Sequence, residues 1–333
     1  MIGPEEPSPG GYVALGGICG LAWAASMRGW MAQLAAGMPH SHSTVTWSTL
    51  ALVLLPGVAV GALLGRAAYL RAAGLPSFRP LIAAPLIFAS ALLDPHIFTE
   101  LIRNGTGGGS LIVVSTALAI GYAMTRERWS VWRSVASLLG SLGLLVLFGM
   151  GGLAGPLGTP HGAWVSALGC SLVLLLGLAA ALPHPSTHGF LNARKTIALG
   201  GLLGFTWAAG LRGFLAQVAR DSDQVGTWFG TFVLVLLPGA LLGAVLGWAV
   251  VQLRVTSRAI VAQFPPAAFT FAAVVIAALT ASPLTARNLW LDLYLASLLA
   301  VFAGGIAIPL TAIRRERQRG RDPYRSGPRS LCP

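Results

Sequence analysis

Long apolar stretches dominate this chain and restrict it to one class of fold. Hydrophobic residues make up 55% of the 333 residues and charged residues only 10%, which is too little charge for the surface of a soluble protein of this size. An α-helix needs about 20 apolar residues to cross the roughly 30 Å hydrocarbon core of a bilayer. Ten stretches approach or exceed that length: residues 12–37, 47–70, 80–94, 109–124, 134–152, 163–182, 196–219, 228–252, 264–282 and 290–312. We therefore predict an all-α polytopic membrane protein with about ten transmembrane helices.

The basic residues between these stretches predict the orientation of the helices. Alternate loops and the C-terminal segment carry 17 Lys and Arg residues, whereas the opposite loops carry only Arg103, Arg220 and Arg287. Positive charge collects on the cytoplasmic side of membrane proteins. The asymmetry predicts a multi-pass protein with both termini in the cytoplasm, and we assign it to the cytoplasmic membrane of a bacterium.

The sequence contains an internal repeat. Gly16–Leu34 and Gly200–Val218 are identical at ten of nineteen positions, and Leu52–Gly65 closely matches Leu234–Gly247. Six predicted helices separate equivalent points, so the two copies have the same orientation and their relating axis runs along the membrane normal, as in transporters built from parallel repeats. The predicted units are a first four-helix repeat (1–128), a linking helix pair (129–195), a second four-helix repeat (196–317) and a basic tail (318–333).

Each copy carries one arginine, Arg28 or Arg212, inside an apolar helix. An intramembrane charge is costly and is a candidate functional residue by default. Both arginines continue a ridge of small residues at four-residue spacing, so they should face another helix. In one interpretation they line an outward-facing pocket and bind an anion through their planar, permanently charged guanidinium groups. The residues predicted to bind this solute are Arg28, Arg212, Gln33, Gln217, Trp23, Trp207 and Asp292.

A structural interpretation of the arginines stays open. Each one would reach the outer headgroups with its long side chain, or pair with a carbonyl or a carboxylate such as Asp292. Asp292 has no counterpart in the other copy, so a single symmetric pairing cannot neutralise both arginines.

Glycines at four-residue spacing follow a proline in the second helix of each copy. Small residues at this spacing let helix backbones approach closely, and proline tends to kink a helix and free a backbone carbonyl. The predicted packing residues are Pro56, Gly57, Gly61 and Gly65 in the first copy and Pro238, Gly239, Gly243 and Gly247 in the second. A gating helix that lines a cavity is the alternative interpretation.

No residue pattern indicates a cofactor, a metal site, catalysis or nucleic-acid binding. Cys19, Cys170 and Cys332 form no CxxC pair, and the His40-x-His42 pattern lacks further ligands. The chain should therefore contact lipid and, as a transporter or permease-like protein, a small solute for which two arginines favour an anion. A non-catalytic membrane scaffold or assembly factor is the first alternative. An enzyme acting on lipid is the second, and the scarcity of intramembrane acids and bases argues against it. The oligomeric state is left open.

Overall fold

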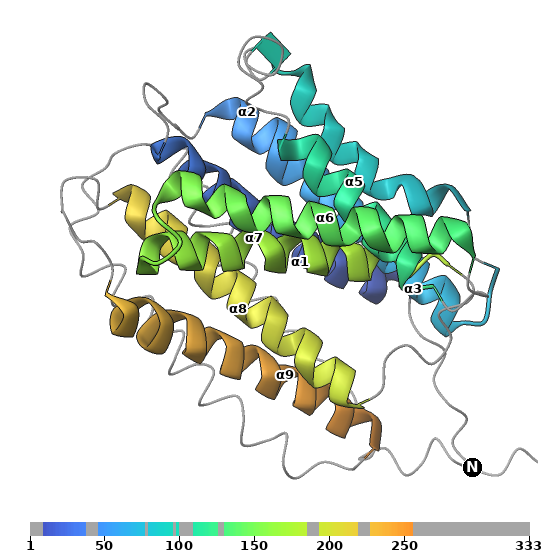
Figure 1. Cartoon of the computed structure of the whole chain (residues 1–333). Helices are drawn as coiled ribbons and strands as arrows, with labels where there is room; N and C mark the ends of the chain where they lie inside the picture. Colours follow the sequence, from blue (N-terminus) through green and yellow to red (C-terminus); the bar gives the residue numbers. More distant parts are fainter. Residues whose placement is uncertain are drawn as a thin grey trace, which may run out of the picture.

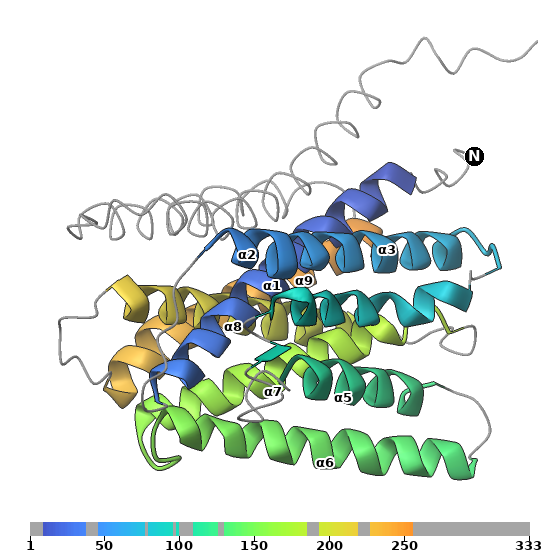
Figure 2. The same ribbon diagram turned by 90° about the horizontal axis from the view of Figure 1, so that it is seen from above.

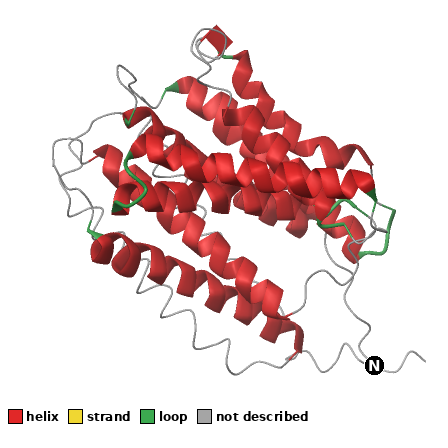
Figure 3. Cartoon of the chain, viewed as in Figure 1, coloured by secondary structure: helices red, strands yellow, loops and turns green. Residues whose placement is uncertain are grey.

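The protein is described by a computed structural model over residues 9–37, 46–76, 79–95, 98–99, 109–125, 130–184, 193–218 and 227–255. All regular elements in these ranges are helices (Figures 1 and 3). The α-helices are α1 (Pro9–Ala36), α2 (Trp47–Thr49), α3 (Leu55–Ala72), α5 (Gly109–Ala123), α6 (Val131–Ala154), α7 (Pro160–Ala180), α8 (Ala193–Val218) and α9 (Leu237–Val255). The π-helical segments are η1 (Leu50–Leu54) and η4 (Phe229–Leu236), and η2 (Arg79–Leu93) is a 3₁₀ helix.

Four of the described helices are long and apolar enough to cross a membrane. They are α1, the continuous helix Trp47–Arg71, α6 and α7. The prediction of an all-α membrane protein is confirmed to this extent. The predicted helices at 264–282 and 290–312, and the basic tail, lie outside the described residues, so the number ten remains a prediction.

One face of α6 exposes large apolar side chains. Leu138, Leu142 and Leu145 are exposed and lie on one side of the helix at three- to four-residue spacing. Figure 2 shows α6 at the edge of the bundle. A stripe of large apolar side chains is costly in water and favourable against lipid tails, so α6 forms part of the lipid-facing perimeter.

Helix α1 lies in the interior of the bundle. Every residue from Trp23 to Trp30 is buried, and the helix contacts α3, α7 and α8 on its different sides (Figures 1 and 2). An apolar helix that is buried all round belongs to the core. The charge of Arg28 is therefore enclosed by protein.

Helices α1 and α3 meet at their glycines, and α8 and α9 meet in the same way. A Cβ added to Gly16 would lie 2.8 Å from Gly65 Cα, and one added to Gly200 would lie 3.0 Å from Gly247 Cα. Such distances leave no room for a side chain, so the backbones are in direct contact. The glycines that follow Pro56 and Pro238 lie in these two contacts: Gly57, Gly61 and Gly65 with α1, and Gly239, Gly243 and Gly247 with α8.

The third apolar stretch, predicted at 80–94, forms a 3₁₀ helix, which is longer than an α-helix of the same number of residues. Its 15 residues form the 3₁₀ helix η2, which contains Pro85. At a rise of about 2.0 Å per residue the helix extends about 30 Å. An α-helix with the same number of residues would extend only about 22 Å.

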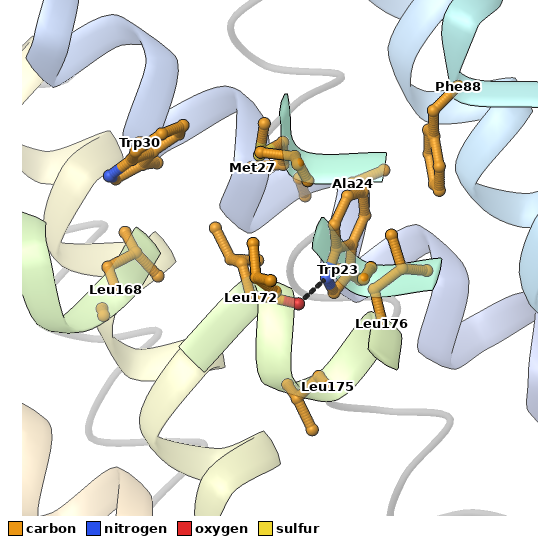
Figure 4. Packing of buried hydrophobic residues seen from close by; sticks show 14 of the residues in the cluster. Trp23, Ala24, Met27, Trp30, Phe88, Leu168, Leu172, Leu175 and Leu176 are labelled. Atoms are coloured by element: carbon orange, nitrogen blue, oxygen red, sulfur yellow. Dashed lines mark hydrogen bonds between the residues drawn. The ribbon is translucent and has the colours of Figure 1, made fainter. Parts of the chain in front are cut away.

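Helix α7 is central, although the sequence indicates only a linking pair at 129–195. It contacts α1, α5, α6, α8 and η2, and a larger share of its residues is buried than in the other three candidate spans. The buried side chains of Leu168, Leu172 and Leu176 pack against the apolar face of α1 (Figure 4). The linking segment thus contributes a core helix to the bundle.

Candidate functional site

Helices α1 and α8 cross where both present small residues to each other. A Cβ added to Gly210 would lie 2.9 Å from Ser26 Cα, and one added to Gly213 would lie 3.4 Å from Gly29 Cα. These contacts advance in the same sense along both helices, so α1 and α8 run parallel where they cross.

The residues that meet at this crossing occupy the same places in the two copies of the sequence. Aligning Gly16–Leu34 with Gly200–Val218 pairs Ser26 with Gly210 and Gly29 with Gly213. In an assembly with two-fold symmetry, only residues next to the axis touch their own equivalents. The α1–α8 crossing therefore brings equivalent positions of the two copies of the sequence into contact.

Two buried polar side chains of α1 face this crossing. The Ser26 side chain is fully buried, and its hydroxyl has no hydrogen-bond partner. Gln33 is also buried, and its Nε2 donates to the Gly213 carbonyl of α8 at 3.3 Å. A buried hydroxyl without a partner costs about 1–3 kcal/mol, so the Ser26 hydroxyl is an unsatisfied binding group at the centre of the bundle.

Helix α7 is attached to both crossing helices by polar contacts. Trp23 Nε1 donates to the Leu172 carbonyl at 2.7 Å (Figure 4), and Trp30 Nε1 donates to the Val165 carbonyl at 3.0 Å. On the other side, Thr206 Oγ1 of α8 lies 2.9 Å from Ser171 Oγ. These bonds place α7 against the α1–α8 crossing and close one side of it.

The rings of Trp23 and Trp30 pack between α1 and its neighbouring helices. The Trp23 ring lies 4.5 Å from the Phe88 ring of η2, measured between centroids. The Trp30 indole covers Gly169 of α7, where an added Cβ would lie 2.8 Å from Nε1. Trp23 was a predicted binding residue, and here its one polar hydrogen is used by a backbone carbonyl.

Arg28 and Arg212 belong to the helix pairs, away from the α1–α8 contact. At 3.6 residues per turn, Arg28 lies about 130° around α1 from the face that carries Ser26, Gly29 and Gln33. It instead continues the ridge of Gly20 and Ala24, which packs on α3. Arg28 is only 6% exposed.

Arg212 has the equivalent place on α8. It follows Gly204 and Ala208, which pack on α9, and it is half-buried. The His161 ring at the start of α7 packs edge-on against Trp164 at 5.6 Å between centroids. The two arginines therefore lie on opposite sides of the crossing, and their helix register does not direct them at one another.

The remaining predicted site residues divide into two groups. Trp207 is buried in α8 beside the α1–α8–α7 region. The side chain of Gln217 and the whole of Asp292 lie outside the described part of the chain. Within that part, His, Cys, Asp and Glu form no group of three that would suit a metal ion.

Sequence reasoning missed the hydroxyl groups of the crossing. Ser26, Ser171 and Thr206 lie in apolar runs, where serine and threonine commonly bond to their own helix backbone and give no signal. Ser171 Oγ and Thr206 Oγ1 do make such bonds, to the Leu168 and Leu202 carbonyls. The available signal was the exchange of serine for glycine at matched positions 26 and 210 of an otherwise well-preserved repeat.

Comparison of the chain with protein-family models, with curated proteins and with solved structures gives no match.

Proposed function

We propose that the protein is a transporter or permease-like membrane protein that binds a small solute between two parallel four-helix repeats. The repeats are residues 1–128 and 196–317, with the termini on the cytoplasmic side of the cytoplasmic membrane. The observation that carries the proposal is the pairing of Ser26 with Gly210 and of Gly29 with Gly213 at the α1–α8 crossing. Transporters built from repeats bind their substrates near the bilayer midplane, where the repeats meet.

The matching contacts within each half support this architecture. Gly20 meets Gly61 as Gly204 meets Gly243, with the added Cβ in both cases 2.9 Å from the partner Cα. The second helices also share a π-helical segment directly before the proline–glycine step. Agreement in packing register as well as in sequence is what a duplicated unit requires.

The crossing suits a solute that accepts hydrogen bonds. Ser26 offers a hydroxyl without a partner, and the Ser171–Thr206 pair lies on the same three-helix contact. Helices α1 and α8 carry Arg28 and Arg212 on the faces turned toward α3 and α9, and α1, α7 and α8 contain no Asp or Glu. The electrostatic potential there is consequently positive, which favours an anion.

The described state is closed at the crossing. Ser26, Gly29 and Gly213 are all buried and in contact with the opposite helix. Solute entry would require α1 and α8 to separate, and a rocking of one repeat against the other about their shared axis supplies that movement. Separation would also free the Ser26 hydroxyl to bind the solute.

Thermal unfolding of the purified protein in detergent tests this proposal. The probes are inorganic phosphate, sulfate, nitrate, acetate and lactate, with glycerol as a neutral comparison. A solute present at ten times its Kd stabilises the folded state by about 1.4 kcal/mol, which raises the Tm of a protein of this size by about 3 °C. We expect at least one anion to raise Tm.

Two variants give this measurement its control. The double variant Arg28→Gln/Arg212→Gln should lose the shift because the positive potential is gone. Gly149→Ala should retain it, because a Cβ at Gly149 on α6 meets nothing within 4 Å. A panel without any shift in the wild-type protein, or a shift that the double variant retains, would contradict the anion proposal and favour a non-catalytic scaffold.

A further inference from the structure

The second helix of each half changes the spacing of its buried residues at a proline. After Pro238, Gly239 and Gly243 are buried four residues apart, in contact with α8. Before it, the buried residues of η4 are Thr231 and Leu236, which are five residues apart. The buried face of this helix therefore has a longer repeat before the proline than after it.

The first half shows the same change. Gly57 and Gly61 follow Pro56 and contact α1 at four-residue spacing. Thr49 and Leu54 precede the proline and are buried five residues apart. Hydrogen bonds between residues five apart define a π turn, which brings such residues close to one face of the helix. The two halves thus agree in the identity and the spacing of the residues that the π turn buries.

One backbone hydrogen bond closes each π turn. The Leu55 N–H donates to the Leu50 carbonyl, and the Leu237 N–H donates to the Phe232 carbonyl. In an α-helix the same N–H groups would bond to the carbonyl four residues back. The proline that follows each donor has no N–H and forms a helical hydrogen bond in neither arrangement. The proline therefore does not tie the segment before it to one register.

We propose that the two π turns are hinges at which the second helix of each half changes register by one residue. In the alternative register the Leu55 N–H bonds to the Ala51 carbonyl, and the segment before the proline becomes α-helical. Residues five apart in an α-helix lie about 140° apart around the axis, and residues four apart lie about 40° apart. Thr49 then turns away from the face of Leu54, and Leu50 takes its place.

In the second half the same step turns Thr231 away and brings Phe232 to its place. Each step replaces a threonine hydroxyl on the buried face with a large apolar side chain. Because η1 contacts α1 and η2, and η4 contacts α8 and α7, these helices meet the exchanged side chains. The segment after each proline keeps its position, because its glycines are in backbone contact with α1 or α8. Only the part of the helix before the proline has to rotate.

Both hinges lie beside the α1–α8 crossing. Ala24 of α1 contacts Gly57 of α3, and Ala208 of α8 contacts Gly239 of α9. Because the paired helices run antiparallel, η1 and η4 are level with the residues that follow Ala24 and Ala208, and those residues form the crossing. A register change in either half therefore alters the surroundings of the crossing. The inference concerns the conformation of each half and does not depend on the proposed solute.

Single-residue deletions test the register change. Deletion of Leu52 places the Leu50 carbonyl four residues before Leu55, so the hydrogen bond that closes the π turn becomes an α-helical bond between the same two groups. Deletion of Leu234 does the same for the bond between Leu237 and Phe232 in the other half. Because each deletion holds its hinge in one register without changing the buried face, we expect Tm to change by less than about 3 °C.

The matched control deletions lie on the other side of the prolines. Deletion of Val58 breaks the four-residue spacing of Gly57 and Gly61, and deletion of Ala240 breaks that of Gly239 and Gly243. Each brings side chains into a contact that has no room for them. We expect these variants to lose more than about 5 °C in Tm or to fail to fold.

Hydrogen-exchange mass spectrometry of the full-length protein measures the motion itself. In the wild type, peptides covering 50–55 and 232–237 should exchange at least about tenfold faster than those covering 57–65 and 239–247, because a register change opens the bonds of the π turn. Deletion of Leu52 should slow exchange in 50–55 to within about threefold of that in 57–65, and it should leave 232–237 unchanged. Deletion of Leu234 should do the reverse.

Three results would overturn the proposal. The first is equal exchange on the two sides of the prolines in the wild type, which needs no variant. The second is fast exchange that neither deletion slows, as fraying from the helix end would give. The third is a loss of Tm on deletion of Leu52 as large as on deletion of Val58, because the π turn would then be required for packing.

Discussion

The hydroxyl of Ser26 occupies the space that a side chain on Gly210 would need. An added Cβ on Gly210 would lie 2.9 Å from Ser26 Cβ and still closer to Oγ. The two residues hold the same place in the two copies of the sequence, so one copy supplies the side chain and the other supplies the room for it. This exchange makes a close parallel crossing of α1 and α8 sterically possible, at the cost of a buried hydroxyl without a partner.

Removing that hydroxyl should stabilise the described state. We expect Ser26→Ala to raise the free energy of unfolding by about 1 kcal/mol, because it deletes an unpaired buried polar group and leaves the packing unchanged. Ser171→Ala is the control and should lower it by about 1 kcal/mol, since Ser171 Oγ bonds to Thr206. Thermal unfolding in detergent distinguishes the two. A loss of stability in Ser26→Ala as large as in Ser171→Ala would show that Ser26 has a partner.

The glycine contacts within each half should be intolerant of a methyl group. An added Cβ on Gly61 would lie 2.7 Å from Gly20 Cα, and one on Gly243 would lie 2.8 Å from Gly204 Cα. Overpacking of this kind costs about 1–3 kcal/mol, and we expect Gly61→Ala and Gly243→Ala to lower Tm by similar amounts. Gly149→Ala, with open space around it, should be neutral or slightly stabilising. Equal Tm values for all three variants would contradict direct backbone contact.

The indole hydrogen of Trp30 should contribute to stability. Trp30→Phe removes the donor to the Val165 carbonyl and part of the ring that covers Gly169, and we expect it to cost about 1–3 kcal/mol. Trp132 lies exposed on the lipid-facing side of α6, so Trp132→Phe should change stability by less than about 0.5 kcal/mol. If the two variants unfold at the same temperature, α7 is not held to α1 in this way.

Periodicity and composition predict the individual helices better than their contacts. The glycines at four-residue spacing lie on the faces where α3 and α9 meet α1 and α8, and small residues at this spacing let membrane helices approach closely. The 3₁₀ form of η2 was not predictable, since tertiary packing chooses between helix types of similar local energy. The π-helical turns do have a local cause in Pro56 and Pro238, but proline alone does not distinguish a kink from a π turn.

The central position of α7 is the largest feature that the sequence did not predict. Helices α1 and α8 contain the repeated sequence, whereas α7 has no repeated counterpart that would distinguish it in the sequence. The hydrogen bonds that hold α7 to α1 are accepted by the backbone carbonyls of Val165 and Leu172. Because every residue type has a backbone carbonyl, the sequence does not mark these acceptors. Which helix fills the centre depends on side-chain fit, which composition and periodicity do not encode.

Disulfide cross-linking across α1 and α8 tests most directly whether equivalent residues meet. Gly29→Cys and Gly213→Cys are combined in a background without Cys19, Cys170 and Cys332, with a protease site in the 185–192 connection, because a Cβ added to Gly213 would lie 3.4 Å from Gly29 Cα. After oxidation in native membranes and cleavage, the two fragments should remain joined until reductant is added. The control pair, Gly29→Cys with Gly204→Cys, should release its fragments, because Gly204 faces α9. Release of the fragments by the Gly29–Gly213 pair, with both cysteines reduced, would contradict the proposed axis between the repeats.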